Sequence, residues 1–388
     1  MKILLISRGY MSKEDPVLGN FEAEQAFALK RAGHDVIIAS IDRRVFRKHF
    51  RKIGMSKIVD KGISIYNFYF PLYAPIIKRN PLIPFSFSDW FYQKMMLRLY
   101  NKIERENWRP DIVYAHYLFN SHMALPLKQQ LSIPFVAIEH WSQLNNDVLS
   151  KRVRKLGDDV YSQVDKVLSV SIATSNRLKQ HFDIDSPVCY NMIDNKSFTY
   201  LPDKSLNSKV TFVTVGRNQY RKGFDVLIEA LNRMDRKIDF LLHIIGSGEW
   251  DDIKALVGKY GLNDKVKFWG AIEQRSDVVK IMRESDVFVL PSRKETFGVV
   301  YVEAMMMGLP VIATPCGGPE EYVNETNGLL VPIDDADKLA SAMEYMAANH
   351  CRYDGKLISE DVNRLFSPET ISDQIINVFN EVLDKYRK

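Results

Sequence analysis

The chain has 388 residues, of which 46% are hydrophobic and 26% charged, and its formal net charge is +5. This is ordinary globular composition, which excludes disordered, collagenous and coiled-coil proteins, and the length suggests two domains. The three cysteines cannot form a disulfide framework and lack metal-ligand spacing, so a reducing cytoplasm is expected. The N-terminal apolar run, about five residues, is too short for a signal peptide, and no stretch approaches a membrane span.

Short apolar runs rich in Val and Ile alternate with helical patterns along the whole chain. Such alternation predicts βαβ units and parallel sheets with both faces covered. One small sheet cannot hold all these strands, so two Rossmann-like domains are expected. The predicted strands are Lys2–Ser7, Asp35–Ser40, Asp111–His116, Pro134–His140, Lys166–Ser171, Lys209–Val215, Asp239–Ile245, Val266–Gly270, Asp286–Pro291, Pro310–Thr314 and Gly328–Pro332.

The pattern breaks near Ser186–Ser208, where prolines and polar residues interrupt it. We therefore predict an N-terminal domain over residues 1–190 and a C-terminal domain over residues 191–367. A last helix, over residues 368–388, is expected to cross back onto the N-terminal domain.

Residues 41–102 differ from the rest of the chain. Between Ile41 and Asp60 there are seven Arg or Lys and two Asp, and an aromatic, proline-rich stretch follows. A basic and aromatic segment could rest on an anionic membrane surface. Alternatively, it is an insertion that packs its aromatic rings internally and solvates its charges.

A glycine turn with two cations follows the strand at Lys209–Val215. The segment reads VTVGRNQYRKGFDVLIEAL and places Arg217 and Lys222 in the loop between strand and helix. Ligands of open α/β sheets bind at this end of the strands. A guanidinium and an ammonium suit a diphosphate, although a solvated surface loop would look the same.

Two acids lie eight residues apart after the strand at Asp286–Pro291. Glu295 is expected in the loop and Glu303 past the first turn of the following helix. That helix offers free N–H groups at its start, near Gly298, and carboxylates accept hydroxyl hydrogens well. Two surface acids near a helix start are the alternative. In combination with the cation loop, the pair indicates a site for a sugar joined to a diphosphate.

These elements together resemble a family 4 glycosyltransferase of the GT-B fold, which is retaining and uses nucleotide sugars. The resemblance implies an α/β architecture of two facing Rossmann-like domains with an interdomain cleft. It covers roughly Lys209–Pro332 closely and the N-terminal half loosely. The matching residues are Gly216, Arg217, Lys222, Gly223, Glu295, Phe297, Gly298, Glu303, Gly308, Pro310, Val311, Gly317, Gly318 and Glu320 or Glu321.

The resemblance implies a role for each part of the donor site. Arg217 and Lys222 bind the diphosphate and stabilise its departure, Glu303 holds the ribose, and Glu295 contacts the transferred sugar. The remaining donor-binding residues are Gly19, Gly216, Ile272, Phe297, Gly298 and Val299.

Histidines end two of the N-terminal strands. By the resemblance, His140 faces the reacting sugar and is a catalytic residue, together with Arg217, Lys222 and Glu295. A capped turn residue is the alternative for His140. The candidate acceptor-binding residues are His116, Glu139 and Trp141.

No metal, cofactor or nucleic acid is expected. Two Asp-x-Asp strings, at Asp183 and Asp185 and at Asp335 and Asp337, lie in polar connecting segments and are interpreted as solvated turns. The two cations would neutralise the diphosphate, and the basic cluster lacks a nucleic-acid recognition motif.

The sequence thus predicts a hexosyltransferase that acts on a glycan or lipid-linked glycan in polysaccharide biosynthesis, with a UDP- or GDP-linked donor. Its expected location is cytoplasmic, with possible contact to the inner membrane face. Two alternatives remain open: a GT-B nucleotide-sugar epimerase and a non-catalytic sugar-nucleotide-binding protein.

Overall fold

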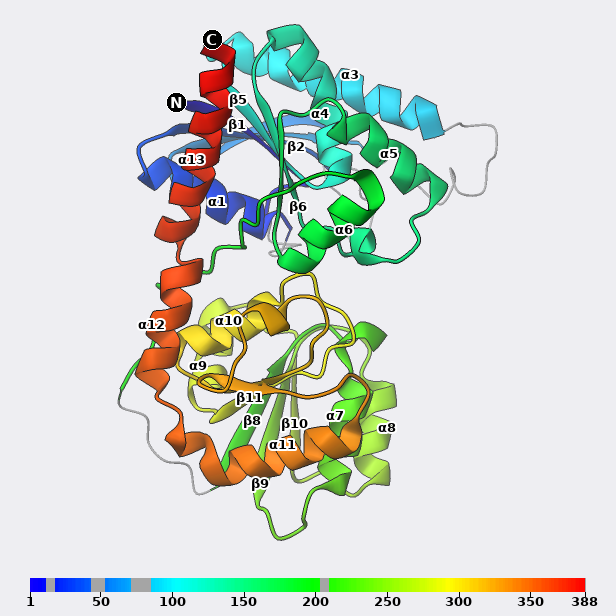
Figure 1. The fold of residues 1–388 in the computed structure, drawn as a ribbon, viewed down its shortest axis with the longest axis vertical. Helices are drawn as coiled ribbons and strands as arrows, with labels where there is room; N and C mark the ends of the chain where they lie inside the picture. The colour runs from blue at the N-terminus through cyan, green and yellow to red at the C-terminus, as the bar shows by residue number, and fades with distance from the viewer. Residues whose placement is uncertain (12–17, 43–52, 71–84, 203–208, 388) are drawn as a thin grey trace. The chain divides into compact units, whose positions relative to one another are not determined.

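The computed structural model describes residues 1–11, 18–42, 53–70, 85–202 and 209–387 (Figure 1). The chain divides into two compact units. The N-terminal unit comprises Met1–Val170, Thr174–Met192 and Pro368–Lys388, and the C-terminal unit comprises Ser171–Ala173 and Ile193–Ser367.

The N-terminal unit is a seven-stranded sheet covered by helices, with strand order β3-β4-β2-β1-β5-β6-β7. Its central strands are buried on both faces, as continuous apolar runs predict. Its elements are β1 (Lys2–Ser7), α1 (Asn20–Arg31), β2 (Asp35–Asp42), β3 (Gly54–Asp60), β4 (Ile63–Tyr69), α3 (Phe85–Glu104), β5 (Ile112–His116), α4 (Leu118–Leu131), β6 (Phe135–Glu139), η1 (Ser142–Asn145), α5 (Lys151–Tyr161), β7 (Lys166–Ser169), α6 (Ile172–Phe182) and α13 (Pro368–Arg387).

One edge of this sheet departs from the sequence prediction. Strands β3 and β4 were not among the predicted strands, and β3 pairs antiparallel with β4, so the expectation of purely parallel sheets is wrong at this edge. Strand β3 is largely exposed, and its residues therefore lack the apolar run on which the strand prediction depended. Residues 43–52 and 71–84 of the basic and aromatic segment lie outside the described residues.

The described part of that segment packs its aromatic residues in two ways. Tyr66, Tyr92 and Tyr100 are fully buried in the main core of the N-terminal unit. Phe87 and Trp90 on α3 are instead 48% and 52% exposed. Internal packing therefore accounts for only part of this aromatic composition.

Helix α13 belongs to the N-terminal unit. It packs against α1 (Figure 1). The ring of Phe379 on α13 meets that of Tyr114 edge-on at 5.1 Å. The Tyr386 hydroxyl donates to the Asp165 carboxylate at 3.0 Å. These contacts attach the end of the chain to the first domain.

The C-terminal unit is a six-stranded parallel sheet with strand order β10-β9-β8-β11-β12-β13. All six of its strands were predicted, with ends shifted by at most two residues. Its elements are β8 (Val210–Val215), η2 (Tyr220–Lys222), α7 (Phe224–Arg233), β9 (Phe240–Ile245), α8 (Asp251–Lys259), β10 (Val266–Gly270), α9 (Arg275–Arg283), β11 (Val287–Val289), α10 (Val299–Met306), β12 (Val311–Ala313), η3 (Pro319–Glu321), β13 (Gly328–Leu330), α11 (Ala336–Asn349), η4 (His350–Arg352) and α12 (Gly355–Phe366).

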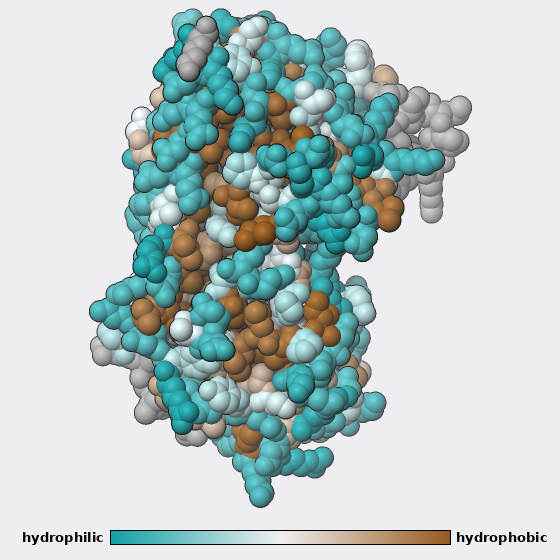
Figure 2. All heavy atoms as spheres, viewed as in Figure 1, coloured by the Kyte–Doolittle hydropathy of each residue, from teal (hydrophilic) through white to brown (hydrophobic). Residues whose placement is uncertain are grey.

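Hydrophilic residues cover most of the face seen in Figure 2. None of the helices in the described ranges combines the length and the hydropathy that a membrane span needs.

Candidate active site

Polar residues gather in each unit where the parallel strands end. In the N-terminal unit, His116 is the last residue of β5 and His140 directly follows β6. Because β5 and β6 are parallel neighbours, the two rings lie side by side. His116 Nδ1 and His140 Nε2 are 3.1 Å apart, and the rings are stacked with an interplanar angle of 13°. The structure thus joins two residues that the sequence analysis assigned to different roles.

Both histidines are buried, and burial decides their charge. His116 is 0% exposed and His140 is 8% exposed. Burial lowers the pKa of His140 to about 4 and that of His116 well below its usual range. Two neutral rings share one hydrogen bond, in which one ring donates and the other accepts. The other two ring nitrogens, His116 Nε2 and His140 Nδ1, are both buried, and the Asn191 side chain raises the His140 pKa against the larger effect of burial.

A buried ion pair lies near the two histidines. Glu22 on α1 is fully buried, and its Oε1 accepts from Arg8 Nε at 2.8 Å. Burial favours the neutral acid, but the Arg8 charge and hydrogen bonds outweigh it and lower the Glu22 pKa to about 2. The carboxylate is therefore ionised, and its charge is compensated from the partly exposed end of β1.

Tyr117 links this ion pair to the histidines. The Arg8 guanidinium lies 4.1 Å from the centre of the Tyr117 ring, and that ring is 4.9 Å from the His140 ring. Tyr117 has a φ of 68°, which is uncommon for a residue with a side chain and costs conformational energy. Backbone strain of this kind is often found at active sites and ligand-binding sites.

Glu139 and Trp141, the two other candidate acceptor-binding residues, contact the start of α4. Glu139 is 0% exposed, its Oε2 accepts from the Leu118 amide at 3.2 Å, and burial raises its pKa to about 8. Trp141 packs edge-on against Phe119 at 4.7 Å. With His116 also fully buried, two of the three predicted acceptor contacts have no exposed side chain in this structure. Their predicted contact with an acceptor stays a prediction.

Gly19 precedes helix α1 and has a φ of 71°. A Cβ built there would lie 2.1 Å from the Gly9 carbonyl oxygen, so only glycine fits this close approach. The position thus has a structural requirement for glycine, and its predicted contact with the donor stays a prediction.

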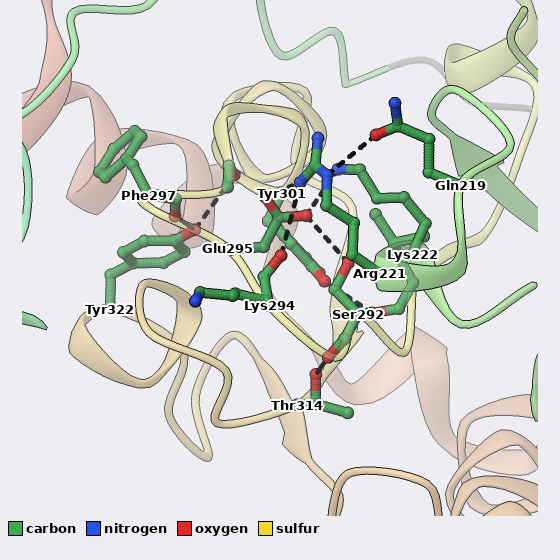
Figure 3. Close-up of polar contacts among 12 residues, drawn as sticks. Gln219, Arg221, Lys222, Ser292, Lys294, Glu295, Phe297, Tyr301, Thr314 and Tyr322 are labelled. Carbon is green, nitrogen blue, oxygen red and sulfur yellow. Dashed lines mark hydrogen bonds and ion pairs between the residues drawn. The ribbon is translucent and has the colours of Figure 1, made fainter. Parts of the chain in front are cut away.

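The C-terminal unit brings together Lys222 and Glu295 (Figure 3). Lys222 ends the turn after β8, and Glu295 lies in the loop after β11, which is the parallel neighbour of β8. Lys222 Nζ donates to Glu295 Oε1 at 2.5 Å, and the side chains are 9% and 7% exposed. The structure places a cation and an acid from the two predicted loops in direct contact at this edge, and both side chains are almost completely buried.

Two further donors contact Glu295. The Ser292 hydroxyl donates to Glu295 Oε1 at 2.9 Å. Arg221 Nη1 donates to Glu295 Oε2 at 3.3 Å. Arg217, the cation that the sequence analysis selected, is exposed and has no hydrogen-bond or ion-pair partner of its side chain in the described ranges. Arg221, rather than Arg217, is the guanidinium that contacts the acid in this structure.

The loop that carries Glu295 is fastened to the following segment. The Glu295 amide donates to the Cys316 carbonyl at 2.9 Å, and the Tyr322 hydroxyl donates to the Phe297 carbonyl at 2.6 Å (Figure 3). Cβ atoms built on Gly317 and Gly318 would lie 2.7 Å from the Glu295 carbonyl oxygen and 2.4 Å from that of Phe297. This loop leads through Gly298 into α10, whose first amides lack partners within the helix.

Glu303 and Ile272, two further predicted donor-binding residues, lie in the C-terminal unit. Glu303 lies past the first turn of α10, and its Oε1 accepts from Arg275 Nη2 at 3.2 Å. Arg275 also reaches Asp194 at 3.6 Å and covers the ring of Phe198. Ile272 is half-buried in the loop after β10. The roles of Glu303 and Ile272 in donor binding stay predictions.

The Asp-x-Asp strings make ordinary surface contacts. Lys179 pairs with Asp183 at 2.8 Å and with Asp185 at 3.1 Å. Asp335 caps α11, and Asp337 pairs with Arg233. The ranges that the structure describes hold no group of three or more His, Cys, Asp or Glu side chains that could bind a metal ion.

Sequence reasoning missed the residues that support the predicted ones. Glu22 and Gln25 lie on the same buried face of α1 as Leu29, and two polar residues on an apolar helix face are a signal for a buried polar site. Arg221 and Arg217 both belong to the same loop, and spacing alone does not distinguish them.

Two family models match the chain in succession. The model described as "Glycosyltransferase Family 4" matches residues 20–196, and the model described as "Glycosyl transferases group 1" matches residues 202–359. The chain belongs to family 4 of the glycosyltransferases. The first model covers most of the N-terminal unit, and the second covers the sheet with Lys222 and Glu295.

Individual relatives of this family 4 glycosyltransferase match most of its length. A glycogen synthase of Mycobacterium tuberculosis is 24% identical over 361 residues, which are 88% of this chain and 85% of that protein. A sucrose-phosphate synthase from Thermosynechococcus elongatus has a similar structure, with a TM-score of 0.75, 21% identity and 99% of each chain covered. Anabaena HepE in complex with UDP and glucose gives a TM-score of 0.72, with 18% identity and 98% and 100% covered. These solved structures establish the GT-B fold with its two Rossmann-like domains.

Proposed function

We propose that this glycosyltransferase moves a hexosyl group, with retention of configuration, from a UDP- or GDP-linked donor to a glycan or lipid-linked glycan. The observation that carries the proposal is the pair of Lys222 and Glu295 at the carboxyl ends of β8 and β11. A cation for phosphate and an acid for hydroxyls, adjacent at a sheet edge, suit a sugar diphosphate.

Each charged group of the C-terminal unit has a task in this proposal. Arg217 and Lys222 compensate the charge that develops on the departing diphosphate. The first amides of α10 add a positive end of the helix dipole. Glu295 accepts hydroxyl hydrogens of the transferred sugar, and Glu303, held by Arg275, accepts those of the ribose.

The N-terminal unit takes the acceptor and supplies His140. A neutral imidazole donates or accepts a hydrogen bond without adding charge, which suits a group beside the anomeric centre. The departing phosphate oxygen takes the acceptor's proton, so the protein needs no carboxylate nucleophile. HepE, similar in structure, is named as a complex with UDP and glucose, which favours UDP among the donor bases.

A polysaccharide acceptor is supported by the relationship to a glycogen synthase. A membrane-linked acceptor is supported by α3, where Phe87 and Trp90 are exposed and Lys94 and Arg98 follow at helical spacing. We propose a cytoplasmic location with contact to an anionic membrane face. Sedimentation with vesicles that contain anionic lipid tests this contact, and recovery of all protein in the supernatant would contradict it.

A donor screen tests the function itself. Thermal unfolding with UDP, GDP and ADP sugars should show a higher midpoint with one base, and mass spectrometry should then show transfer to a glycan. Nuclear magnetic resonance of the product should show the anomeric configuration of the donor. Inversion would contradict the mechanism, and loss of turnover in chelator that Mg²⁺ restores would contradict the absence of a metal.

The same screen separates the two alternatives. An epimerase would convert the donor sugar without any acceptor present. A non-catalytic protein would bind a nucleotide sugar and leave it unchanged with every acceptor. Transfer to a glycan acceptor would exclude both.

A further inference from the structure

Arg221 is fastened between the two loops that carry Lys222 and Glu295 (Figure 3). Its Nε donates to Gln219 Oε1 at 3.0 Å. Its Nη1 donates to the Lys294 carbonyl at 3.4 Å and to Glu295 Oε2 at 3.3 Å. A side chain 43% exposed would be free to rotate without such partners, so these contacts fix the direction from which its charge reaches the acid.

The two oxygens of Glu295 have different partners. Oε1 accepts from Lys222 Nζ at 2.5 Å and from the Ser292 hydroxyl at 2.9 Å. A carboxylate oxygen offers about two acceptor positions, so those of Oε1 are occupied. Oε2 accepts from Arg221, so the position still open to a sugar hydroxyl is on Oε2, next to Arg221.

Compensation of the Glu295 charge also depends on Arg221. Lys222 and Glu295 are 9% and 7% exposed, so each depends on the other for compensation. If the Lys222 ammonium binds a diphosphate, it shares its charge with that ligand. Glu295 then lies beside an anion and retains only Arg221 as a cation of its own.

We propose that Arg221 is a positioning residue for the donor sugar: it holds Glu295 Oε2 in place and compensates the carboxylate while Lys222 binds the donor diphosphate. This inference rests on the donor site proposed above and adds one residue to it. Arg221 then acts on the sugar half of the donor, through Glu295, whereas Arg217 and Lys222 act on the phosphates. Direct binding of Arg221 to the diphosphate is the competing role.

Binding of a nucleotide with and without its sugar distinguishes these roles. The probes are UDP and UDP-glucose, or the corresponding pair for the base that the donor screen selects, measured by calorimetry. Arg221→Ala should keep the affinity for the bare nucleotide within about 2-fold and weaken that for the nucleotide sugar about 10-fold, the loss of one charge-assisted hydrogen bond. Arg221→Lys should lie between wild type and Arg221→Ala, because an ammonium reaches one acceptor but lacks the fork that joins three.

A donor analogue gives a readout that a merely structural role would not change. Deoxy analogues of the donor sugar remove one ring hydroxyl at a time. In the wild type, loss of the hydroxyl that Glu295 accepts should lower kcat/KM about 10-fold or more. In Arg221→Ala, kcat/KM for the same analogue should be at most about 2-fold lower than kcat/KM for the complete donor, because Glu295 is already displaced.

The matched control is Arg236→Ala. Arg236 is exposed in the turn before β9, at the amino ends of the strands, and its replacement removes the same charge away from the site. It should leave both affinities unchanged. Arg221→Gln keeps hydrogen-bond donors without charge and replaces Arg221→Ala if the latter unfolds at assay temperature.

Three results would overturn the inference. Equal weakening of nucleotide and nucleotide sugar in Arg221→Ala would assign Arg221 to the phosphates. Unchanged binding and unchanged kcat/KM in Arg221→Ala would leave it without a role. If wild-type protein binds no nucleotide sugar, the donor site itself is wrong, and this inference fails with it.

Discussion

The N-terminal and C-terminal units place their polar residues at the same edge of similar sheets but treat charge in opposite ways. In the N-terminal unit, burial keeps His116 and His140 neutral, and the charged pair of Arg8 and Glu22 lies near them. In the C-terminal unit, Lys222, Arg221 and Glu295 are all charged groups in direct contact.

This difference separates two kinds of work. A neutral histidine forms and releases hydrogen bonds without rearranging ions around it, which suits a group that meets uncharged hydroxyls. Paired ions exchange partners when an anion arrives, which suits a diphosphate. The predictions below test whether the two units keep to these roles.

We expect the largest effect on activity from the charged residues of the C-terminal unit. Lys222→Ala should reduce transfer about 10³-fold and lower stability by about 3 kcal/mol, because Glu295 stays buried without its closest cation. Arg217→Ala should reduce transfer about 10²-fold without changing stability, since its side chain is exposed. Initial rates and thermal unfolding measure both effects.

A double variant sharpens this result. Lys222→Ala combined with Glu295→Gln should recover much of the lost stability but none of the activity. Wild-type turnover by Lys222→Ala or Arg217→Ala would contradict the assignment of that residue to the diphosphate.

In the N-terminal unit, we expect replacement of His140 to have the larger effect on transfer. His140→Ala should reduce transfer about 10²-fold, and His116→Ala less, because His116 is fully buried and contacts His140. Since the His140 pKa is lowered to about 4, the rate should show no titration of this group between pH 6 and pH 8. A step near pH 6.5 that disappears in His140→Ala would show that the histidine works as a charged group.

Glu22 tests the charge behind the histidines through stability. Its pKa is about 2 in the folded chain and near 4.5 when unfolded, so its contribution is present above pH 4.5 and is lost as the pH falls toward 2. Glu22→Gln should therefore cost about 2 kcal/mol at pH 7 and progressively less in acid. Glu360→Gln, on the surface of α12, is the control and should change stability little at any pH. An equal loss at pH 7 and pH 3 would contradict the ion pair.

Glu139 should affect stability with the opposite dependence on pH. Burial raises its pKa to about 8 from near 4.5, so the folded protein retains a proton that the unfolded chain releases between these values. Stability from this group falls as the pH rises through that range. Glu139→Gln, which stays neutral, should be more stable than the wild type at pH 8 and should gain nothing at pH 4. Denaturant titrations at both pH values decide it, and destabilisation at pH 8 would contradict the buried neutral acid.

The sequence predicted the strands that are buried on both faces, because continuous Val and Ile runs are their direct cause. It missed β3 and β4, since an exposed edge strand such as β3 needs few apolar residues and resembles a basic surface segment. Strand pairing on that edge depends on contacts between distant residues, which a local pattern does not contain.

In the site, the sequence identified Lys222, Glu295 and His140 by their places after strands. It did not distinguish Arg221 from Arg217, because both lie in one loop and only the path of the backbone decides which guanidinium reaches Glu295. Nor did it show that Lys222 is buried, because its contact with Glu295 joins two loops that are distant in the sequence.

The joined loops after β11 and β12 limit how donor selectivity can be altered. Since Gly317 and Gly318 leave no room for a Cβ against the backbone of Glu295 and Phe297, neither segment can be lengthened or reshaped alone. A graft of residues 295–299 from a relative would have to bring residues 316–322 with it. New sugar preferences in this scaffold are therefore more accessible by exchanging side chains such as Arg221 than by remodelling the main chain.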